Sequence, residues 1–230
     1  MVMSMADEFQ GSLRELRRAL ELNPSLAAAY LSLSDLSTTL GDTQEMLRAA
    51  EEAYRLDPLS PRTVTWLGGA YFFAGRGEEA MEHWRKTLHL DPYRTYRRMF
   101  DYYVSKGEYG EAEKAVKEME RLCPALDTTI LNRGYLAAST GDEKTAREMI
   151  AKLDRGAGVG TTPEAGFIYY ALGDLDRFFE YQFRAAKDHT LSAGLLRYSP
   201  LFEKARRDPR LEEAFRMAGI PYETSQSSDH

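Results

Sequence analysis

The chain has almost no cysteine, and it has no long apolar run. Cys123 is the only cysteine among 230 residues, which excludes a disulfide within the chain and a cysteine metal cluster. No apolar stretch reaches the roughly 18 residues that a membrane-spanning helix needs. The opening residues, MVMSMADEF, lack the basic start and apolar run of a signal peptide, so a cytoplasmic location is expected.

Positive charge is outnumbered, with 30 lysines and arginines against 36 acidic residues. The net charge of −6 argues against general binding to nucleic acids or to anionic membranes. Hydrophobic residues make up 43% of the chain and charged residues 29%, which is ordinary for a protein that buries a core.

Catalytic and metal-binding patterns are missing as well. His83 and His89 are six residues apart, a spacing that puts them on different faces of a helix, and no further ligand completes a metal set. The run Gly156-x-Gly158-x-Gly160 lacks the Lys-Ser/Thr pair of a phosphate-binding loop, so we expect a flexible connector there. No serine lies in a Gly-x-Ser-x-Gly motif. The sequence therefore predicts no enzyme activity, no cofactor and no metal.

What the sequence does have is a repeat. Five glycines follow one another at intervals of 34, 32, 34 and 32 residues: Gly41, Gly75, Gly107, Gly141 and Gly173. Prolines keep the same period at Pro24, Pro58, Pro92 and Pro124. Such self-similarity indicates one supersecondary unit stacked several times. Each glycine ends an amphipathic run and precedes a charged one, which is typical of a left-handed helix end followed by a new helix.

The second repeat carries the most complete motif. Its residues are Leu67-Gly68-x2-Tyr71, then Ala80-x3-Trp84, then Pro92. This spacing resembles the tetratricopeptide repeat (TPR) family, and the resemblance covers about residues 8–190. It implies an all-α fold, a right-handed superhelical solenoid of antiparallel helix pairs. About five repeats are expected, with capping helices at both ends.

The repeat also predicts the boundaries of the parts. We expect a flexible N-terminus at 1–7, a lone helix at 8–23, repeats at about 26–58, 60–92, 93–124, 127–156 and 160–189, a C-terminal helical cap at 191–222 and a disordered tail at 223–230. The lone helix lacks its partner, so the chain is a fragment of a longer protein, or this helix caps the array or binds a partner. The last part resembles the closing segment of TPR modules in multidomain prokaryotic signalling and regulatory proteins, with a helix start at Asp208-Pro209 and a stop at Gly219.

The third repeat departs from the pattern. Only 15 positions separate Pro92 from Gly107, whereas the equivalent distance is 17 in three other repeats. It also has Phe100 where the others have a small residue that lets two helices approach closely. Those small residues are Ser34, Gly68, Gly134 and Gly166. We expect altered helix packing and a local change of superhelical twist around residues 93–107.

In TPR proteins the first helix of each repeat, helix A, lines a concave groove where peptides bind. The resemblance assigns to this groove Arg62, Trp66, Phe73, Arg94, Arg97, Arg98, Asp101, Asn132, Tyr135 and Tyr170, together with Gly69, Leu131 and Phe167. The arginines form a basic strip in an otherwise acidic protein, and arginine pairs with carboxylates through two parallel hydrogen bonds. The expected function is a non-catalytic protein-interaction scaffold that binds an acidic or C-terminal segment of a protein partner, with no nucleic acid and no membrane.

Other interpretations of these residues stay open. Phe100, Tyr96 and Tyr103 suit a core between helices. The three arginines suit a solvated face paired with Glu82 or Glu118.

The alternatives for the function are an oligomerisation module that associates through the array ends and a regulatory arm of a larger signalling protein that senses a small effector. The two-carboxylate clamp of chaperone-binding TPR proteins is not expected, because Leu31 and Asp35 stand where its lysine and asparagine would be. The sequence does not name the partner.

Overall fold

A computed structural model describes residues 5–156 and 165–222, and these two stretches contain helices and turns but no strand. The predicted all-α fold of paired helices is confirmed. The chain divides into two compact units. Unit 1 consists of Met1–Asp91 and Ser192–His230, and unit 2 of Pro92–Leu191. The first boundary falls at the shortened link before the third repeat.

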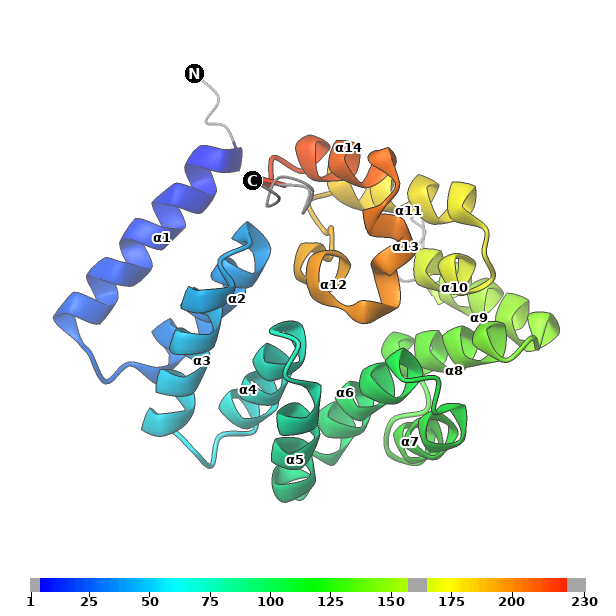
Figure 1. The fold of residues 1–230 in the computed structure, drawn as a ribbon, viewed down its shortest axis with the longest axis horizontal. Helices are drawn as coiled ribbons and strands as arrows, with labels where there is room; N and C mark the ends of the chain where they lie inside the picture. Colours follow the sequence, from blue (N-terminus) through cyan, green and yellow to red (C-terminus); the bar gives the residue numbers. More distant parts are fainter. Residues whose placement is uncertain (1–4, 157–164, 223–230) are drawn as a thin grey trace, which may run out of the picture. The chain divides into compact units, whose positions relative to one another are not determined.

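Unit 1 contains the lone helix, two helix pairs and the C-terminal helices (Figure 1, blue to cyan, then orange to red). Its helices are α1 (Met5–Leu22), α2 (Ala27–Leu40), α3 (Thr43–Leu56), α4 (Pro61–Phe73), α5 (Gly77–Thr87), α12 (Ala193–Tyr198), a 3-10 turn (Pro200–Phe202), α13 (Glu203–Arg206) and α14 (Pro209–Met217). Helices α2 and α3 pack as one pair, and α4 and α5 as the next. Helix α1 packs on α2, and α12 packs on both α2 and α4.

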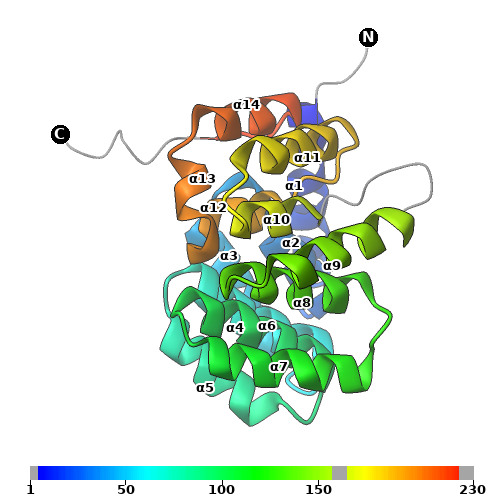
Figure 2. The same cartoon turned by 90° about the vertical axis from the view of Figure 1, so that its right-hand side faces the viewer.

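Unit 2 contains three further pairs (Figure 2, green to yellow). They are α6 (Pro92–Ser105) with α7 (Tyr109–Leu122), α8 (Asp127–Ser139) with α9 (Glu143–Gly156), and α10 (Ala165–Ala171) with α11 (Leu175–Lys187). Helix α7 packs on α8, and α10 packs on both α8 and α9. The connector expected around residues 158–160 lies outside the described residues.

The periodic glycines end the A helices as predicted. Their φ angles lie between 73° and 96°, the left-handed region that a residue with a Cβ avoids. The acid that follows then caps the next helix in several repeats. Asp42 accepts a hydrogen bond from the backbone N–H of Glu45 at 2.9 Å, and Asp174 accepts one from Arg177 at 3.0 Å. A glycine with a positive φ and a capping acid thus form the turn between the two helices of a repeat.

The glycines inside the A helices serve close packing, also as predicted. A Cβ added to Gly68 would lie 2.1 Å from Nε1 of Trp84 on the paired helix. At Gly134 it would lie 2.8 Å from Cβ of Met149, and at Gly166 it would lie 2.7 Å from Cβ of Tyr181. The two helices of a pair approach until only hydrogen fits between them, and this contact forms the core of each repeat.

The third repeat is shortened in its link. Helix α4 begins at Pro61, three residues after Pro58, but α6 begins directly at Pro92. Proline suits the first turn of a helix because its missing N–H would have no partner there. Phe100 is buried and its ring lies edge-on to that of Tyr135, with centroids 6.4 Å apart. The change of twist expected around this repeat stays a prediction.

Candidate protein-binding faces of the A helices

The arginines of α6 lie on one side of an amphipathic helix. Residues 95, 99, 100, 101, 102 and 104 are buried, whereas positions 94, 97 and 98 on the arginine side keep part or all of their exposure. Arg94 is exposed, whereas the side chains of Arg97 and Arg98 keep 24% and 15% of their exposure. Partial burial reduces the mobility and hydration of these two guanidinium groups.

Both half-buried arginines face the same carboxylate. Oδ2 of Asp101 lies 3.8 Å from Nη1 of Arg97 and 3.9 Å from Nη1 of Arg98. These distances are longer than hydrogen bonds, and Oδ2 of Asp101 is buried and accepts no hydrogen bond from the described residues. The acids considered from the sequence pair elsewhere, Glu82 with Lys86 at 2.6 Å and Glu118 with Arg121 at 2.8 Å.

Three predicted site residues of unit 2 are enclosed in the fold. Asp101, Asn132 and Tyr135 are 5%, 3% and 7% exposed. Asn132 donates a hydrogen bond from Nδ2 to Sδ of Met119 at 3.6 Å, so its amide points into the helix pair. Burial raises the pKa of Tyr135, helped by the neighbouring Tyr170 and Asp101. Leu131 and Phe167, on the same faces, are also buried.

Tyr170 on α10 is partly exposed, and its ring packs on Phe178 with centroids 5.1 Å apart. The accessible groups of this face are therefore Arg94, the outer parts of Arg97 and Arg98, and Tyr170. We call these four residues the arginine face.

In unit 1 two of the predicted site residues, Trp66 and Phe73, contact neighbouring helices. Arg62 is exposed and Gly69 is buried. The indole N–H of Trp66 donates a hydrogen bond to Oγ of Ser34 on α2 at 2.7 Å. The ring of Phe73 packs on Tyr198 of α12, with centroids 6.2 Å apart. The A-helix face of unit 1 is thus covered in part by the C-terminal segment.

This contact was not predicted from the sequence. On α12, Gly194 meets α2 so closely that an added Cβ would lie 2.5 Å from Cγ2 of Thr38. Arg197 donates from Nη2 to the carbonyl of Thr39 at 3.4 Å, across 158 residues of sequence. The spacing of positions 194, 197 and 198 places them on one face of a helix. No sequence feature near these positions identifies the surface that this face contacts.

His83 has a packing role between helices. Its Nε2 lies 2.9 Å from the carbonyl oxygen of Val64, and because a carbonyl only accepts, Nε2 carries the proton. The imidazole lies edge-on to the rings of Tyr54 and Tyr71, with centroids 5.2 and 6.3 Å away. Burial lowers the pKa of His83, so the neutral form is favoured in the fold.

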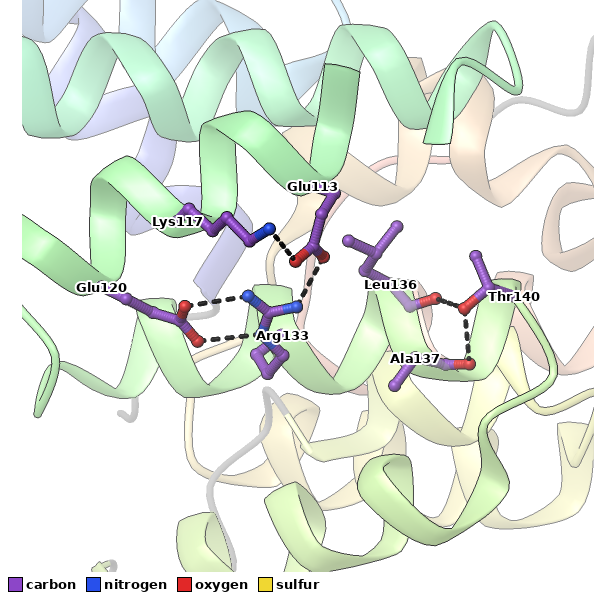
Figure 3. A network of polar contacts seen from close by, with 7 residues as sticks. All are labelled: Glu113, Lys117, Glu120, Arg133, Leu136, Ala137 and Thr140. Carbon is purple, nitrogen blue, oxygen red and sulfur yellow. Dashed lines mark hydrogen bonds and ion pairs between the residues drawn. The ribbon is translucent and has the colours of Figure 1, made fainter. Parts of the chain in front are cut away.

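Arg133 makes a polar link between the third and fourth repeats (Figure 3). From α8 it donates to both carboxylate oxygens of Glu120 at 2.8 Å and to Glu113 at 2.6 Å, both on α7. Lys117 lies 3.5 Å from the other oxygen of Glu113. The hydrogen bonds from Arg133 lower the pKa of Glu120. This network joins two repeats, and sequence spacing alone did not single it out.

The described part of the chain has no group of three or more histidine, cysteine or acidic side chains arranged to hold a metal ion. Among the same residues, no helix combines the length and the apolar character needed to cross a membrane.

Comparisons with known proteins identify the repeat. The family model for the tetratricopeptide repeat matches residues 27–58, which contain α2 and α3. A curated relative, small glutamine-rich tetratricopeptide repeat-containing protein 2 of Mycosarcoma maydis, is 26% identical over 87 residues. The match covers 38% of this chain and only 25% of the relative, so the chain spans a quarter of that protein.

Solved structures show the same fold. PilW, a widely conserved type IV pilus biogenesis factor, aligns with a TM-score of 0.59 at 18% identity, over 82% of this chain and 90% of PilW. A chain of the APC/C hetero-tetramer Cut9–Hcn1 also aligns with a TM-score of 0.59, at 15% identity, over 92% of this chain and 43% of that chain. The predicted tetratricopeptide repeat is thus confirmed at residues 27–58, and the solved structures show the predicted fold over most of the chain. Proteins of this fold are generally scaffolds for protein–protein interaction and are generally not catalysts.

Proposed function

Since the chain is a tetratricopeptide repeat protein, we propose that it is a non-catalytic scaffold whose arginine face binds an acidic segment of a protein partner. The observation that carries the proposal is the pairing on α6. Arg97 and Arg98 share one carboxylate, and that carboxylate lies too far away for a hydrogen bond with either Nη1 group. An incoming carboxylate offers Arg97 the short, two-point contact that Asp101 does not make.

Charge and fold support the same proposal. Helix α6 carries three arginines and a single acid, in a chain with a net charge of −6. Repeat proteins of this architecture commonly use the exposed faces of successive helices as extended binding surfaces. The structural neighbour Cut9 is itself described in a complex with another protein. The cytoplasmic location and the signalling context remain predictions from the sequence.

A peptide titration tests the proposal. A fluorescent peptide rich in glutamate, with a free C-terminal carboxylate, is titrated with the full chain and its anisotropy is followed. The double variant Arg97→Glu with Arg98→Glu should weaken binding by about a hundredfold or more, because each lost charged contact costs about 1.5–3 kcal/mol. Amidation of the peptide C-terminus separates recognition of the terminal carboxylate from recognition of acidic side chains.

The matched control reverses two arginines on second helices of the same unit. Arg121 on α7 and Arg147 on α9 are 65% and 64% exposed and pair with acids of their own helices. The variant Arg121→Glu with Arg147→Glu has the same net charge as the test variant. Equal weakening in both variants, or peptide binding that survives reversal at Arg97 and Arg98, would contradict the arginine face as the site.

A further inference from the structure

The C-terminal segment, residues 192–222, meets α2 and α4 of unit 1 through one face of α12. Gly194 packs against Thr38, and Tyr198 packs against Phe73. Arg197 donates to the carbonyl of Thr39, and it lies so close to Gly41 that an added Cβ there would be 3.1 Å from Nη1. Positions 194, 197 and 198 have the spacing of one helical face, the arrangement by which a short helix docks on a groove.

The segment has a core of its own. Phe202, Leu211 and Phe215 are fully buried, and Nη1 of Arg206 donates to the carbonyls of Leu196 and Ser199 at 3.2 and 2.7 Å. Arg197 also lies over the rings of Phe215 and Tyr222, 4.9 and 5.3 Å from their centroids, and donates to the carbonyl of Pro221. These contacts hold residues 193–222 together as one body.

An apolar cluster formed by α3 and α4 contains no described residue of this segment. The apolar cluster around Met46, Ala50, Leu67 and Ala70 is completed by residues of α3 and α4 and by Ala74. Within the described residues, this cluster has no member from 192–222. This cluster therefore stays complete when the segment leaves, and the departure exposes the face of Thr38 and Phe73.

The link before the segment is strained. Residues 188–192 are not helical, and within the described chain His189 is the one residue other than glycine with a positive φ, 55°. A residue with a Cβ pays an energetic penalty in this left-handed conformation, although histidine adopts it more often than most residues. A short strained hinge favours exchange of the element that it carries, because a straightened hinge relieves the strain while the docking contacts are kept.

We propose that the α2–α4 face is a docking surface for the 192–222 segment of a second copy of this chain. In the single chain the segment occupies the face in cis, and in the dimer each copy receives the segment of the other. The chemistry of the partner is therefore that of α12 itself, with a glycine, an arginine three residues later and a tyrosine four residues later. This proposal concerns unit 1 and its hinge, and it does not depend on the arginine face.

A complementation experiment tests the exchange. The variant Gly194→Leu has an intact face but a segment whose side chain collides with Thr38. The variant Thr38→Trp has an intact segment but a blocked face. We expect each full-length variant alone to be monomeric in light scattering, whereas their mixture forms a heterodimer through the one intact face and the one intact segment. A mixture that stays monomeric at all concentrations would overturn the proposal.

A folding check, a second face variant and a control variant complete the test. Circular dichroism checks that each variant keeps its helical content, and Phe73→Ala is a second face variant in case Thr38→Trp does not fold. Gly110→Leu is the control for a bulky side chain in a helix, because a Cβ at Gly110 meets nothing within 4 Å. With its face and its segment both intact, it should show the same monomer–dimer distribution as the wild-type chain.

The hinge gives an independent readout. His189→Gly removes the strain and should lower the fraction of dimer formed when the wild-type chain is refolded at high concentration. His189→Val increases the strain and should raise that fraction. If both hinge variants give the wild-type fraction of dimer, the hinge does not drive the exchange. If an unrelated helical peptide with the same three residues docks while the chain itself never dimerises, the face serves another protein and the proposal of a second copy is wrong.

Discussion

Trp66 of α4 donates a hydrogen bond from its indole Nε1 to Oγ of Ser34 on α2 at 2.7 Å, and the Ser34 hydroxyl donates a hydrogen bond to the carbonyl of Met46 on α3 at 2.8 Å. One small hydroxyl therefore ties the first helix of one repeat to its paired helix and to the next repeat. A glycine at this place would allow the same close approach but could not make either bond.

Replacement of Ser34 by alanine should lower the free energy of unfolding by about 1–3 kcal/mol, because the indole N–H of Trp66 then loses its partner in a half-buried site. Urea denaturation measures the loss. Ser32→Ala on the same helix is the control, since Ser32 is exposed, and it should change stability by less than about 0.5 kcal/mol. Equal effects of the two substitutions would mean that the hydrogen-bond chain contributes nothing.

Gly68 should not tolerate even a methyl group. A Cβ at this position lies 2.1 Å from Nε1 of the fully buried Trp84, so Gly68→Ala forces the indole to move and should cost about 1–3 kcal/mol. Gly110→Ala has open space and should be neutral or slightly stabilising. Thermal unfolding compares them. Coupling between Gly68→Ala and Trp84→Leu in a double-mutant cycle would assign the cost to this contact, and additive effects would rule that assignment out.

His83 should make the stability of the repeats depend on pH. Burial lowers its pKa below the ordinary value of about 6.5, so protons bind more readily to the unfolded chain. The stability that depends on neutral His83 is complete above about pH 6.5 and is lost as the pH falls below it. His83→Gln should flatten this slope in urea titrations at successive pH values. His89→Gln, at an exposed position, should keep the wild-type slope; a slope that is unchanged in both variants would exclude His83 as its source.

Arg133→Gln should weaken the contact between the third and fourth repeats. The two glutamates that it bonds are 36% and 38% exposed, so solvent screens the pair and the expected loss is about 1–2 kcal/mol. Arg147→Gln, which breaks an exposed pair with Glu143, should cost no more than about 0.5 kcal/mol.

Arg133→Gln should also change the acid limb of the stability curve. Because the folded pKa of Glu120 is lowered, the contribution of this pair is present above the unfolded value of about 4.3 and is lost as the pH falls through the folded pKa. The variant should lose less stability than the wild type over this acid range. Parallel curves for the two proteins would show that the network does not link proton binding to folding.

Local signals in the sequence predicted the helix pairs and their turns. The glycines at the ends of the A helices and the acids that cap the next helices act within one repeat. Gly68 and Gly134 leave room for Trp84 and Met149 on their paired helices, and Ser34 bonds both to its paired helix and to the next repeat. Even the irregular third repeat had a local cause, since α6 starts directly at Pro92. Such features depend on backbone conformation and on steric limits between neighbours, which residue type and spacing express directly.

The candidate site was less accessible to the same reasoning. Helical spacing placed Asn132 and Tyr135 among the groove residues, yet both are buried, because the exposure of a side chain depends on how closely successive helices pack. The pairing of Arg97 and Arg98 with Asp101, in place of Glu82 or Glu118, also required coordinates. The arginine face remains a prediction that the peptide titration addresses.

The sequence by itself determined that this is an all-α chain of tetratricopeptide repeats. The repeat period, the left-handed glycines and the helix caps each depend on residues that are close together in the sequence. Only the tertiary structure decided that the C-terminal segment lies on the first two repeats. Arg197 reaches Thr39 across 158 residues. A contact of that kind depends on the complementary shape of two distant surfaces, and no local rule of residue type or spacing encodes it.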